Sequence, residues 1–423
     1  MSSFRRPFSM ILIASCIAVV PWGPGLLAEE TPPETPPQTP PESPPAPAET
    51  PPPITVVSGA KNYLNLSLDA LLAAGGSTEP DVEQLQVGGH DPNQRGFTVQ
   101  GVELVLDGAV DPYFRGQANI VTLITPDGET RIELEEAYAT TTSLPHDLQV
   151  KVGQFLTEFG RINPTHPHTW DFVDVPLVSG RMFGPDGLRS AGVRASWLMP
   201  LPFYSDLLVA VQNASGETLT AFGGVEGDVY FGRELLPNEV SAAEDLLYVP
   251  RYEASFDVSD TQSILVGTSW AFGPNATGDD GQTRIGGLDL FWKWKSARAN
   301  KGFPFVKVQA EGLARHYEAA ETATLPAAVF DDHGTYAQVV WGVKPMWTVG
   351  ARYDDVGGDT GDDPTDPRFL PRRRASLEGT WYPTEYTKLR AQYSFDDRTS
   401  LDDAHSVWLQ LEFLLGAHAA HKF

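Results

Sequence analysis

The sequence is poor in three features that define common classes of protein. Its 423 residues include one cysteine, which excludes an intrachain disulfide framework and a cysteine-based zinc site. Lysine and arginine number 30 against 55 aspartate and glutamate, and this charge of −25 argues against nucleic-acid binding. A mean hydropathy of −0.22 with scattered charges excludes a bundle of spanning helices, each of about 20 apolar residues. A closed β-barrel is the one spanning form left.

The first residues are typical of an exported protein. Arg5 and Arg6 precede an apolar run over residues 10–20, and Ala28 is followed by an abrupt acidic start. This order predicts a cleaved secretory signal peptide at residues 1–28. An alternative is that residues 13–16 form a bacterial lipobox with Cys16 as the lipidated residue, which the mass of the mature N-terminus would reveal.

A proline-rich segment follows at residues 29–54, with a four-residue repeat of the Thr-Pro-Pro-Glu type. Such a segment lacks the apolar residues for a core and is predicted to be an extended polyproline II spacer in the periplasm. It is either an inert tether or a segment that reaches toward peptidoglycan. No second change of composition occurs, so residues 55–423 are predicted to be one barrel domain.

Apolar and polar residues alternate along most of this domain, for example at residues 64–72, 306–311 and 389–395. A period of two is typical of strands with one apolar face, and strands of about ten residues are long enough to cross a bilayer. We therefore expect an all-β fold, a transmembrane antiparallel β-barrel of about sixteen strands. The expected strands are residues 62–74, 97–106, 115–125, 130–140, 147–155, 190–199, 204–213, 246–258, 262–272, 283–295, 304–317, 334–343, 346–354, 372–383, 387–396 and 405–415.

The connections between these strands alternate between short and long, as they do in outer-membrane barrels. A short turn at 126–129 is the exception. The long connections are acidic and are predicted to face outward, with lipopolysaccharide and outer-membrane lipid as neighbours. Tryptophans near strand ends, such as Trp347 and Trp381, are predicted to form an interfacial girdle. The terminal Phe423 resembles the aromatic residue that the barrel-assembly machinery recognises.

The connection at residues 156–189 differs from the others, because it combines aromatic residues, prolines, histidines and basic residues. It is the third long connection, and we predict that it folds into the lumen as a pore constriction. The predicted constriction residues are Arg161, His166, His168, Asp171, Asp174, Arg181 and Arg189. Arg161, Arg181 and Arg189 are expected to face Glu158, Asp171, Asp174 and Asp186, with about half of these groups in pairs that hold the loop.

At this connection the sequence resembles the phosphate-selective porin-like family of outer-membrane barrels. The resemblance rests on residues 151–155, 159–161 and 183–188, and on the more specific stretches 88–97 and 163–168. Within that family the chain is most similar to barrels labelled zinc-regulated TonB-dependent outer-membrane receptors, although the segment before the first strand leaves no room for a plug domain. The resemblance implies a sixteen-stranded pore with the third loop as its constriction and leaves a homotrimer open, and the predicted outer membrane indicates a Gram-negative source.

Charged residues of both signs are predicted on the lumen wall. The predicted lining residues are Lys151, Arg251, Glu253, Lys307, Glu311, Arg352, Arg374 and Arg390. Lining charges set ion selectivity, but this mixture leaves the sign of the selectivity open.

Two pairs of residues have the chemical groups that metal binding or catalysis requires. His166 and His168 are spaced to bind a metal with Asp171 or Asp174 as a third ligand, but hydrogen bonding within the loop is the favoured interpretation, and no cofactor is predicted. Glu135 and Glu136 occupy successive strand positions and are expected to face opposite sides, and no Gly-x-Ser-x-Gly motif occurs, so no enzyme activity is predicted. The sequence predicts a porin for passive diffusion of small hydrophilic solutes, with a closed barrel that serves as an uptake receptor or structural barrel as the alternative.

Overall fold

The computed structural model describes residues 54–58, 62–109, 111–216, 219–236 and 239–416. The predicted signal peptide at 1–28 with Cys16, the spacer up to residue 53, and Phe423 lie outside the described residues. Nothing in the fold therefore tests these predictions.

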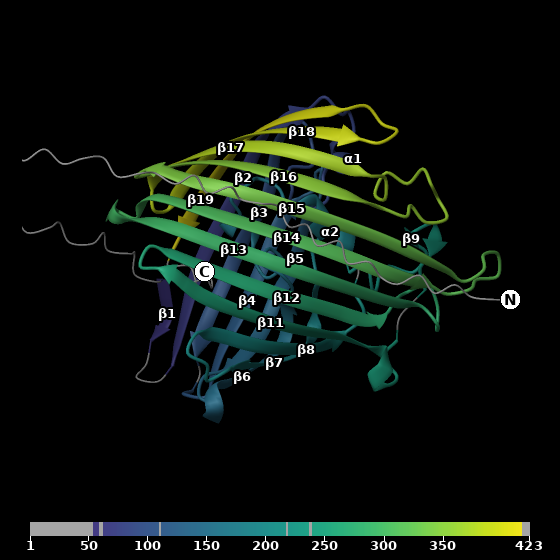
Figure 1. The fold of residues 1–423 in the computed structure, drawn as a ribbon, viewed down its shortest axis with the longest axis horizontal. Helices are drawn as coiled ribbons and strands as arrows, with labels where there is room; N and C mark the ends of the chain where they lie inside the picture. Colours follow the sequence, from purple (N-terminus) through teal and green to yellow (C-terminus); the bar gives the residue numbers. More distant parts are fainter. Residues whose placement is uncertain (1–53, 59–61, 110, 217–218, 237–238, 417–423) are drawn as a thin grey trace, which may run out of the picture. The chain divides into compact units, whose positions relative to one another are not determined.

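Sixteen long strands of the described chain form one antiparallel barrel (Figure 1). Each strand pairs with its neighbour in the chain, β8 pairs with β11, and β19 pairs with β2 to close the barrel. All sixteen predicted strands are confirmed, most with ends shifted by a few residues. They are β2 (Tyr63–Ser77), β3 (Gly96–Ala109), β4 (Phe114–Ile124), β5 (Thr130–Thr141), β6 (Leu148–Leu156), β7 (Arg189–Leu198), β8 (Tyr204–Asn213), β11 (Leu246–Ser259), β12 (Gln262–Pro274), β13 (Gln282–Asn300), β14 (Phe303–Ala319), β15 (Ala328–Lys344), β16 (Trp347–Gly358), β17 (Arg372–Thr384), β18 (Thr387–Arg398) and β19 (Ala404–Leu415).

Several small elements were not expected from the sequence. The strand β1 (Ile54–Ser58) pairs with β2, and β9 (Val229–Tyr230) pairs with β10 (Arg233–Glu234). In the described part of the chain, the α-helices are α1 (Val82–Leu85) and α2 (Leu177–Phe183), and single 3₁₀ turns occur at Pro145–Asp147, Pro167–Thr169 and Ala243–Asp245. None of the described helices has the length and apolar character that a membrane span requires.

The barrel strands place apolar side chains outside and polar side chains inside. In β19, Leu409 is 59% exposed while Gln410 is 3% exposed, and β15 alternates in the same way along nearly its whole length. This arrangement is the reverse of that in a soluble protein, and it is typical of a barrel whose outer face contacts lipid. The alternation in the sequence therefore reports an apolar outer face rather than an apolar core.

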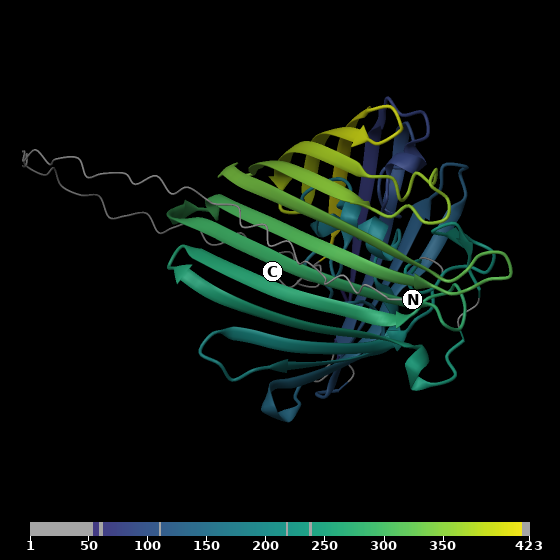
Figure 2. The same cartoon turned by 45° about the vertical axis from the view of Figure 1, so that its right-hand side comes forward.

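The two ends of the barrel differ in the length of their connections (Figure 2). Adjacent strands are joined by short turns at one end, such as 301–302, 345–346 and 385–386, and mostly by longer connections at the other, such as 157–188 and 214–245. The predicted alternation is thus confirmed for most connections, with the turn at 125–129 as the expected exception and the equally short connection 399–403 as a second one. Trp347 and Trp381 lie near the short-turn end, more than a third exposed, with their rings stacked at 6.0 Å.

The interior of the barrel contains an apolar cluster as well as polar groups. Phe155, Phe159, Met182 and Phe183 pack together with apolar side chains of the wall strands, including Ile285 of β13. Because these residues include four from β6 and the connection 157–188, that connection lies inside the barrel. It forms the candidate site described next.

Candidate functional site: the loop inside the barrel

The loop 157–188 enters the barrel directly after β6. Gly160 has a φ of +62°, and a Cβ atom there would lie 1.9 Å from the Glu311 Oε2 atom, so the close approach requires glycine. The backbone N–H groups of Arg161 and Ile162 donate to the Glu311 carboxylate at 3.0 and 2.8 Å, and the Tyr336 hydroxyl donates to it at 2.5 Å. The first turn of the loop is therefore anchored to β14 and β15 on the opposite wall.

The middle of the loop is held by strands β14 to β18. Asp171 pairs with Lys307 at 2.6 Å and accepts a hydrogen bond from Gln338 at 3.2 Å. Arg390 donates to the carbonyl oxygens of Trp170 and Phe172 at 2.7 and 3.1 Å. These contacts involve both side chains and backbone carbonyl oxygens of the loop. They therefore hold its backbone in position as well as pairing its charge.

Asp174 makes the most enclosed charge contact of the loop. Its two carboxylate oxygens accept hydrogen bonds from Arg352 at 2.7 Å and from Arg374 at 2.6 Å, and Gln392 donates to it at 2.9 Å. Burial acts to raise the pKa of Asp174, but the charges of the two guanidinium groups outweigh this effect and hold that pKa below its usual value. Asp174 is therefore an anion within a fully buried ion-pair network.

The helix α2 connects the loop to the long-connection end of the barrel. Its Arg181 donates to Asp332 of β15 at 2.8 Å and to the carbonyl oxygen of Phe369 at 3.0 Å. The same Asp332 accepts from Arg315 of β14 at 2.7 Å, and the Leu177 N–H donates to Asp354 at 3.0 Å. The helix thus rests on an ion-paired part of the wall.

About half of the charged groups of the loop were expected to pair with one another, and the structure shows fewer such pairs, because most of these groups contact strand residues instead. Arg189 does contact Asp186 at 3.3 Å, but it also contacts Glu133 of the wall at 3.5 Å. Arg161 lies over the Phe291 ring at 5.0 Å, and Arg181 binds Asp332. Loop and wall residues lie far apart in the sequence, so charge composition alone could not identify their pairing.

The predicted lining residues also lie in the interior, where most are paired. Lys151 binds Glu158 at 2.9 Å, and Arg251 binds Asp289 at 2.6 Å and Glu253 at 2.9 Å. Burial acts to raise the pKa of Glu158, but the charges of Lys151 and Arg194 outweigh it and lower that pKa. The lumen wall is therefore a set of compensated ion pairs rather than a ladder of one sign.

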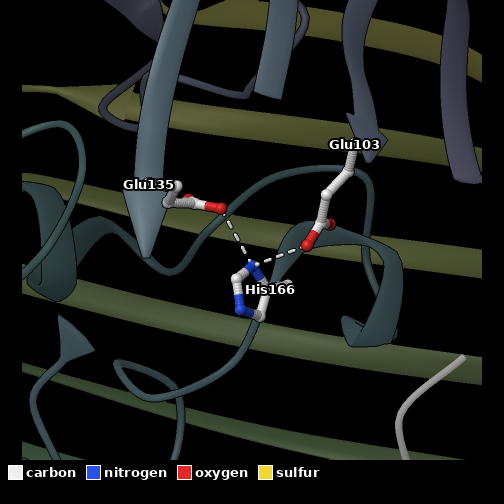
Figure 3. Close-up of side chains that lie close together, drawn as sticks. All are labelled: Glu103, Glu135 and His166. Atoms are coloured by element: carbon white, nitrogen blue, oxygen red, sulfur yellow. Dashed lines mark hydrogen bonds and ion pairs between the residues drawn. The ribbon is translucent and has the colours of Figure 1, made fainter. Parts of the chain in front are cut away.

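His166 and His168 lie in a buried cluster of carboxylates. The His166 Nδ1 atom is 2.9 Å from Glu135 Oε2 and 3.4 Å from Glu103 Oε1 (Figure 3). Its Nε2 atom is 2.9 Å from Glu136 Oε2. His168 lies 3.0 Å from Glu103, with its ring stacked on that of His166. The partners in these contacts are strand glutamates, whereas Asp171 and Asp174, the third ligands of the metal alternative, bind Lys307 and Arg352.

The prediction that Glu135 and Glu136 face opposite sides is also wrong. The pairing of β4 with β5 shifts between Asn119 and Ile120, which pair with Glu136 and Leu134, so Glu135 is the extra residue of a β-bulge. Both glutamates are buried, at 4% and 5% exposure. Residue alternation could not reveal this bulge, because an inserted residue leaves no mark in the composition.

His90 is a further cluster residue that its position in the sequence did not identify. Its Nε2 atom lies 3.4 Å from Glu135 Oε1, and its Nδ1 atom lies 3.4 Å from the Gln100 carbonyl oxygen. It belongs to the connection 78–95, which packs beside the loop through contacts such as Asp91 with the Val175 N–H at 2.9 Å. The one available signal was that residues 88–97 form one of the distinctive stretches of the chain.

A cavity of about 500 Å³ opens beside these segments at the long-connection end. Its charged lining consists of Arg131 and five carboxylates, Glu83, Asp127, Glu129, Glu133 and Asp186. Because Pro185 and Asp186 belong to the loop, the cavity adjoins the candidate constriction.

Comparison with known proteins identifies the fold. No protein-family model matches the chain. An uncharacterized protein of Aquifex aeolicus is 33% identical over 402 residues, which cover 85% of this chain and 79% of that protein. Among solved structures, the outer membrane channel DcaP of Acinetobacter baumannii is 15% identical, with 85% and 99% coverage and a TM-score of 0.55. Pseudomonas putida OprB is 10% identical, with 83% and 94% coverage and a TM-score of 0.52. The fold is thus that of outer-membrane porin-like barrels.

Proposed function

This chain belongs to the same family as the uncharacterized Aquifex aeolicus protein, and we propose that it is an outer-membrane channel for passive diffusion of small hydrophilic solutes or ions. The observation that carries the proposal is the loop 157–188, which lies inside a sixteen-stranded barrel and is bound to the wall through Glu311, Arg352 and Arg374. Barrels of this strand number leave an aqueous lumen unless something fills it. The loop is therefore proposed as the constriction that sets the size limit.

The contacts of the loop argue for a narrow and rigid constriction. Its Asp174 and Arg181 are held in buried pairs, and an unpaired buried charge is strongly unfavourable, so spontaneous displacement of the loop is costly. A solute must then pass beside the loop rather than push it aside. We expect a small and steady conductance.

The experiment compares the wild-type chain with a variant in planar lipid bilayers. In the variant, residues 161–187 are replaced by a short Gly/Ser linker. We expect the single-channel conductance to rise, because the constriction is removed while the wall remains. The matched control removes residues 321–325 from the connection between β14 and β15, and its conductance should equal that of the wild type. Equal conductance of wild type and loop variant would contradict the proposed constriction.

A closed barrel that serves as an uptake receptor or structural barrel is the second candidate. The observation that favours it is the apolar cluster of Phe159, Met182 and Phe183 with wall residues, which resists hydration. If the wild-type barrel is closed, we expect no conductance from it in planar bilayers and a measurable conductance from the loop variant. The same experiment therefore separates the two candidates.

Several finer predictions belong to this proposal. Placement in the outer membrane is supported by the apolar outer face, and cleavage of residues 1–28 is tested by the mass of the mature chain. The closer relation to phosphate-selective porins, the trimeric state, and the contacts with lipopolysaccharide, peptidoglycan and the assembly machinery stay predictions. We propose no enzyme activity.

A further inference from the structure

A cluster of imidazole and carboxylate groups lies inside the barrel wall. It joins Glu103 of β3, Glu135 and Glu136 of β5, His166 of the loop and His90 of the connection 78–95. His166 is 2% exposed, and the other four residues are between 4% and 6% exposed. Three glutamates that are buried together must be neutralised by protons or by a cation.

The spacing of the ligand atoms is that of a metal site. One ligand atom each of Glu103, Glu135 and His166 lies within 4.8 Å of the others, and the Nδ1 atom of His166 points between the two carboxylates (Figure 3). Its distances to them are 2.9 and 3.4 Å. Metal–ligand bonds of about 2.0–2.2 Å place neighbouring ligand atoms roughly 3 Å apart in tetrahedral or octahedral geometry. One small cation therefore fits among these three atoms with little movement.

The second nitrogen of His166 is held as metal-binding histidines usually are. Its Nε2 atom lies 2.9 Å from Glu136 Oε2, so an N–H donated there leaves the Nδ1 lone pair for a metal. A carboxylate on the far nitrogen orients the ring and increases its basicity as a ligand. Glu136 is therefore an orienting residue in this arrangement and not a ligand.

His90 gives an independent indication of a ligand. Its Nε2 atom is buried without a hydrogen-bond partner, and it points at Glu135, 3.4 Å from the Oε1 atom. The Nδ1 atom of the same ring contacts the Gln100 carbonyl oxygen, so Nδ1 carries a proton, and in the neutral ring the lone pair is then on Nε2. A buried nitrogen lone pair directed at a carboxylate is unfavourable unless a proton or a cation lies between them.

We propose that Glu103, Glu135 and His166 bind one divalent transition-metal cation, and that the His90 Nε2 atom, which lies against the other oxygen of Glu135, moves in as the fourth ligand. Two nitrogen and two carboxylate ligands without cysteine suit Zn²⁺ and related borderline cations better than Ca²⁺ or Mg²⁺, which prefer oxygen ligands alone. This site replaces the sequence interpretation of the histidines as hydrogen-bonding groups of a metal-free loop. The cation joins the loop to β3 and β5, on the opposite side from the Glu311 anchor.

The test measures metal bound to the full chain and does not depend on conductance. Wild-type protein is refolded with Zn²⁺, dialysed, and its zinc content is measured by mass spectrometry. We expect one zinc per chain in the wild type and loss of binding in Glu135→Gln. In Glu136→Gln we expect an affinity lower by about 10–100-fold, because this residue only orients a ligand. Co²⁺ substitution adds a visible absorption spectrum that reports nitrogen and oxygen coordination.

The matched control is Glu311→Gln, which removes another buried carboxylate that anchors the same loop. It should retain zinc, because Glu311 lies outside the cluster. Circular dichroism verifies that each variant forms its barrel, and Glu135→Asp, which keeps the charge but shortens the side chain, should bind zinc weakly if Glu135→Gln does not fold. A wild-type barrel refolded with Zn²⁺ that holds none overturns the proposal, as does equal retention in wild type and Glu135→Gln.

Discussion

At the scale of single residues, the lumen depends on carboxylates that each serve several partners. Asp174 lies between Arg352 and Arg374, which also contact Asp354 and Asp396 respectively. Removal of one member of a buried pair leaves a charge without compensation, which costs about 3–5 kcal/mol. The position of the loop is thus set by a few buried carboxylates and not by the overall excess of acidic over basic residues.

The substitution Asp174→Asn tests this arrangement. It keeps the shape of the side chain but leaves two buried guanidinium groups facing a neutral amide. We expect the free energy of unfolding to fall by about 3 kcal/mol, toward the lower end of the range because Asp354 and Asp396 remain. Urea unfolding in lipid vesicles measures the stability, and hydrogen exchange of residues 170–176 measures the detachment of the loop.

The control for this substitution is Asp355→Asn. Asp355 lies on β16, directly after Asp354. Asp355 is about half exposed and pairs with the exposed Arg373 at 3.4 Å. Such a pair contributes about 0–1 kcal/mol, so its loss should barely change stability. If both variants were equally stable, the interpretation of Asp174 as an anchor would be wrong.

At the scale of elements, the sequence predicted what depends on local pattern. The sixteen strands follow from alternation, because lipid on one side and the lumen on the other select opposite residue types at neighbouring positions. The unusual composition of the loop 157–188 singled it out from the other long connections. The short helix α2 and strand β1 were not predicted, because four to seven residues carry too little periodicity.

The candidate site could be predicted only in part, because its contacts join residues that are far apart in the sequence and leave no local pattern. Arg352, Arg374 and Asp174 were correctly placed in the interior, but their mutual contacts join strands and a loop almost 200 residues apart. The bulge at Glu135 reverses the facing that alternation assigns, and it is what brings both Glu135 and Glu136 to His166. Sequence pattern therefore identified which residues are interior but not which of them meet.

The packing of α2 against the connection 78–95 gives a prediction for an element. A Cβ atom at Gly180 would lie 2.4 Å from the Val87 carbonyl oxygen and 2.6 Å from its Cβ atom. We expect Gly180→Val to push α2 away from this connection and to lower stability by about 1–3 kcal/mol, as overpacking does. The control Gly379→Val adds the same side chain on β17, where no atom lies within 4 Å of the added Cβ. Urea unfolding compares the two variants, and equal stability would contradict close packing of α2.

At the scale of the whole molecule, the charge of −25 is unevenly placed. The wall charges around the loop are largely paired, so they contribute little net field to the lumen. The cavity at the long-connection end is different, because five of its charged lining residues are acidic and one is basic. Arg131 of the lining and the adjacent Arg189, which faces Glu133 and Asp186, compensate part of this charge, and the remaining carboxylates leave the cavity acidic.

An acidic cavity beside the constriction should concentrate cations, since charged clefts raise the local concentration of counter-ions. We therefore predict a cation preference, and predict that Asp127→Asn combined with Glu129→Gln lowers it. The change should be clear near 0.01 M salt, where the Debye length is about 30 Å, and small near 1 M, where it is about 3 Å. Reversal potentials in salt gradients measure it. The control Asp279→Asn with Asp280→Asn removes the same charge from an exposed connection outside the cavity. If both pairs of substitutions shifted the reversal potential equally, overall charge rather than the cavity would set the selectivity.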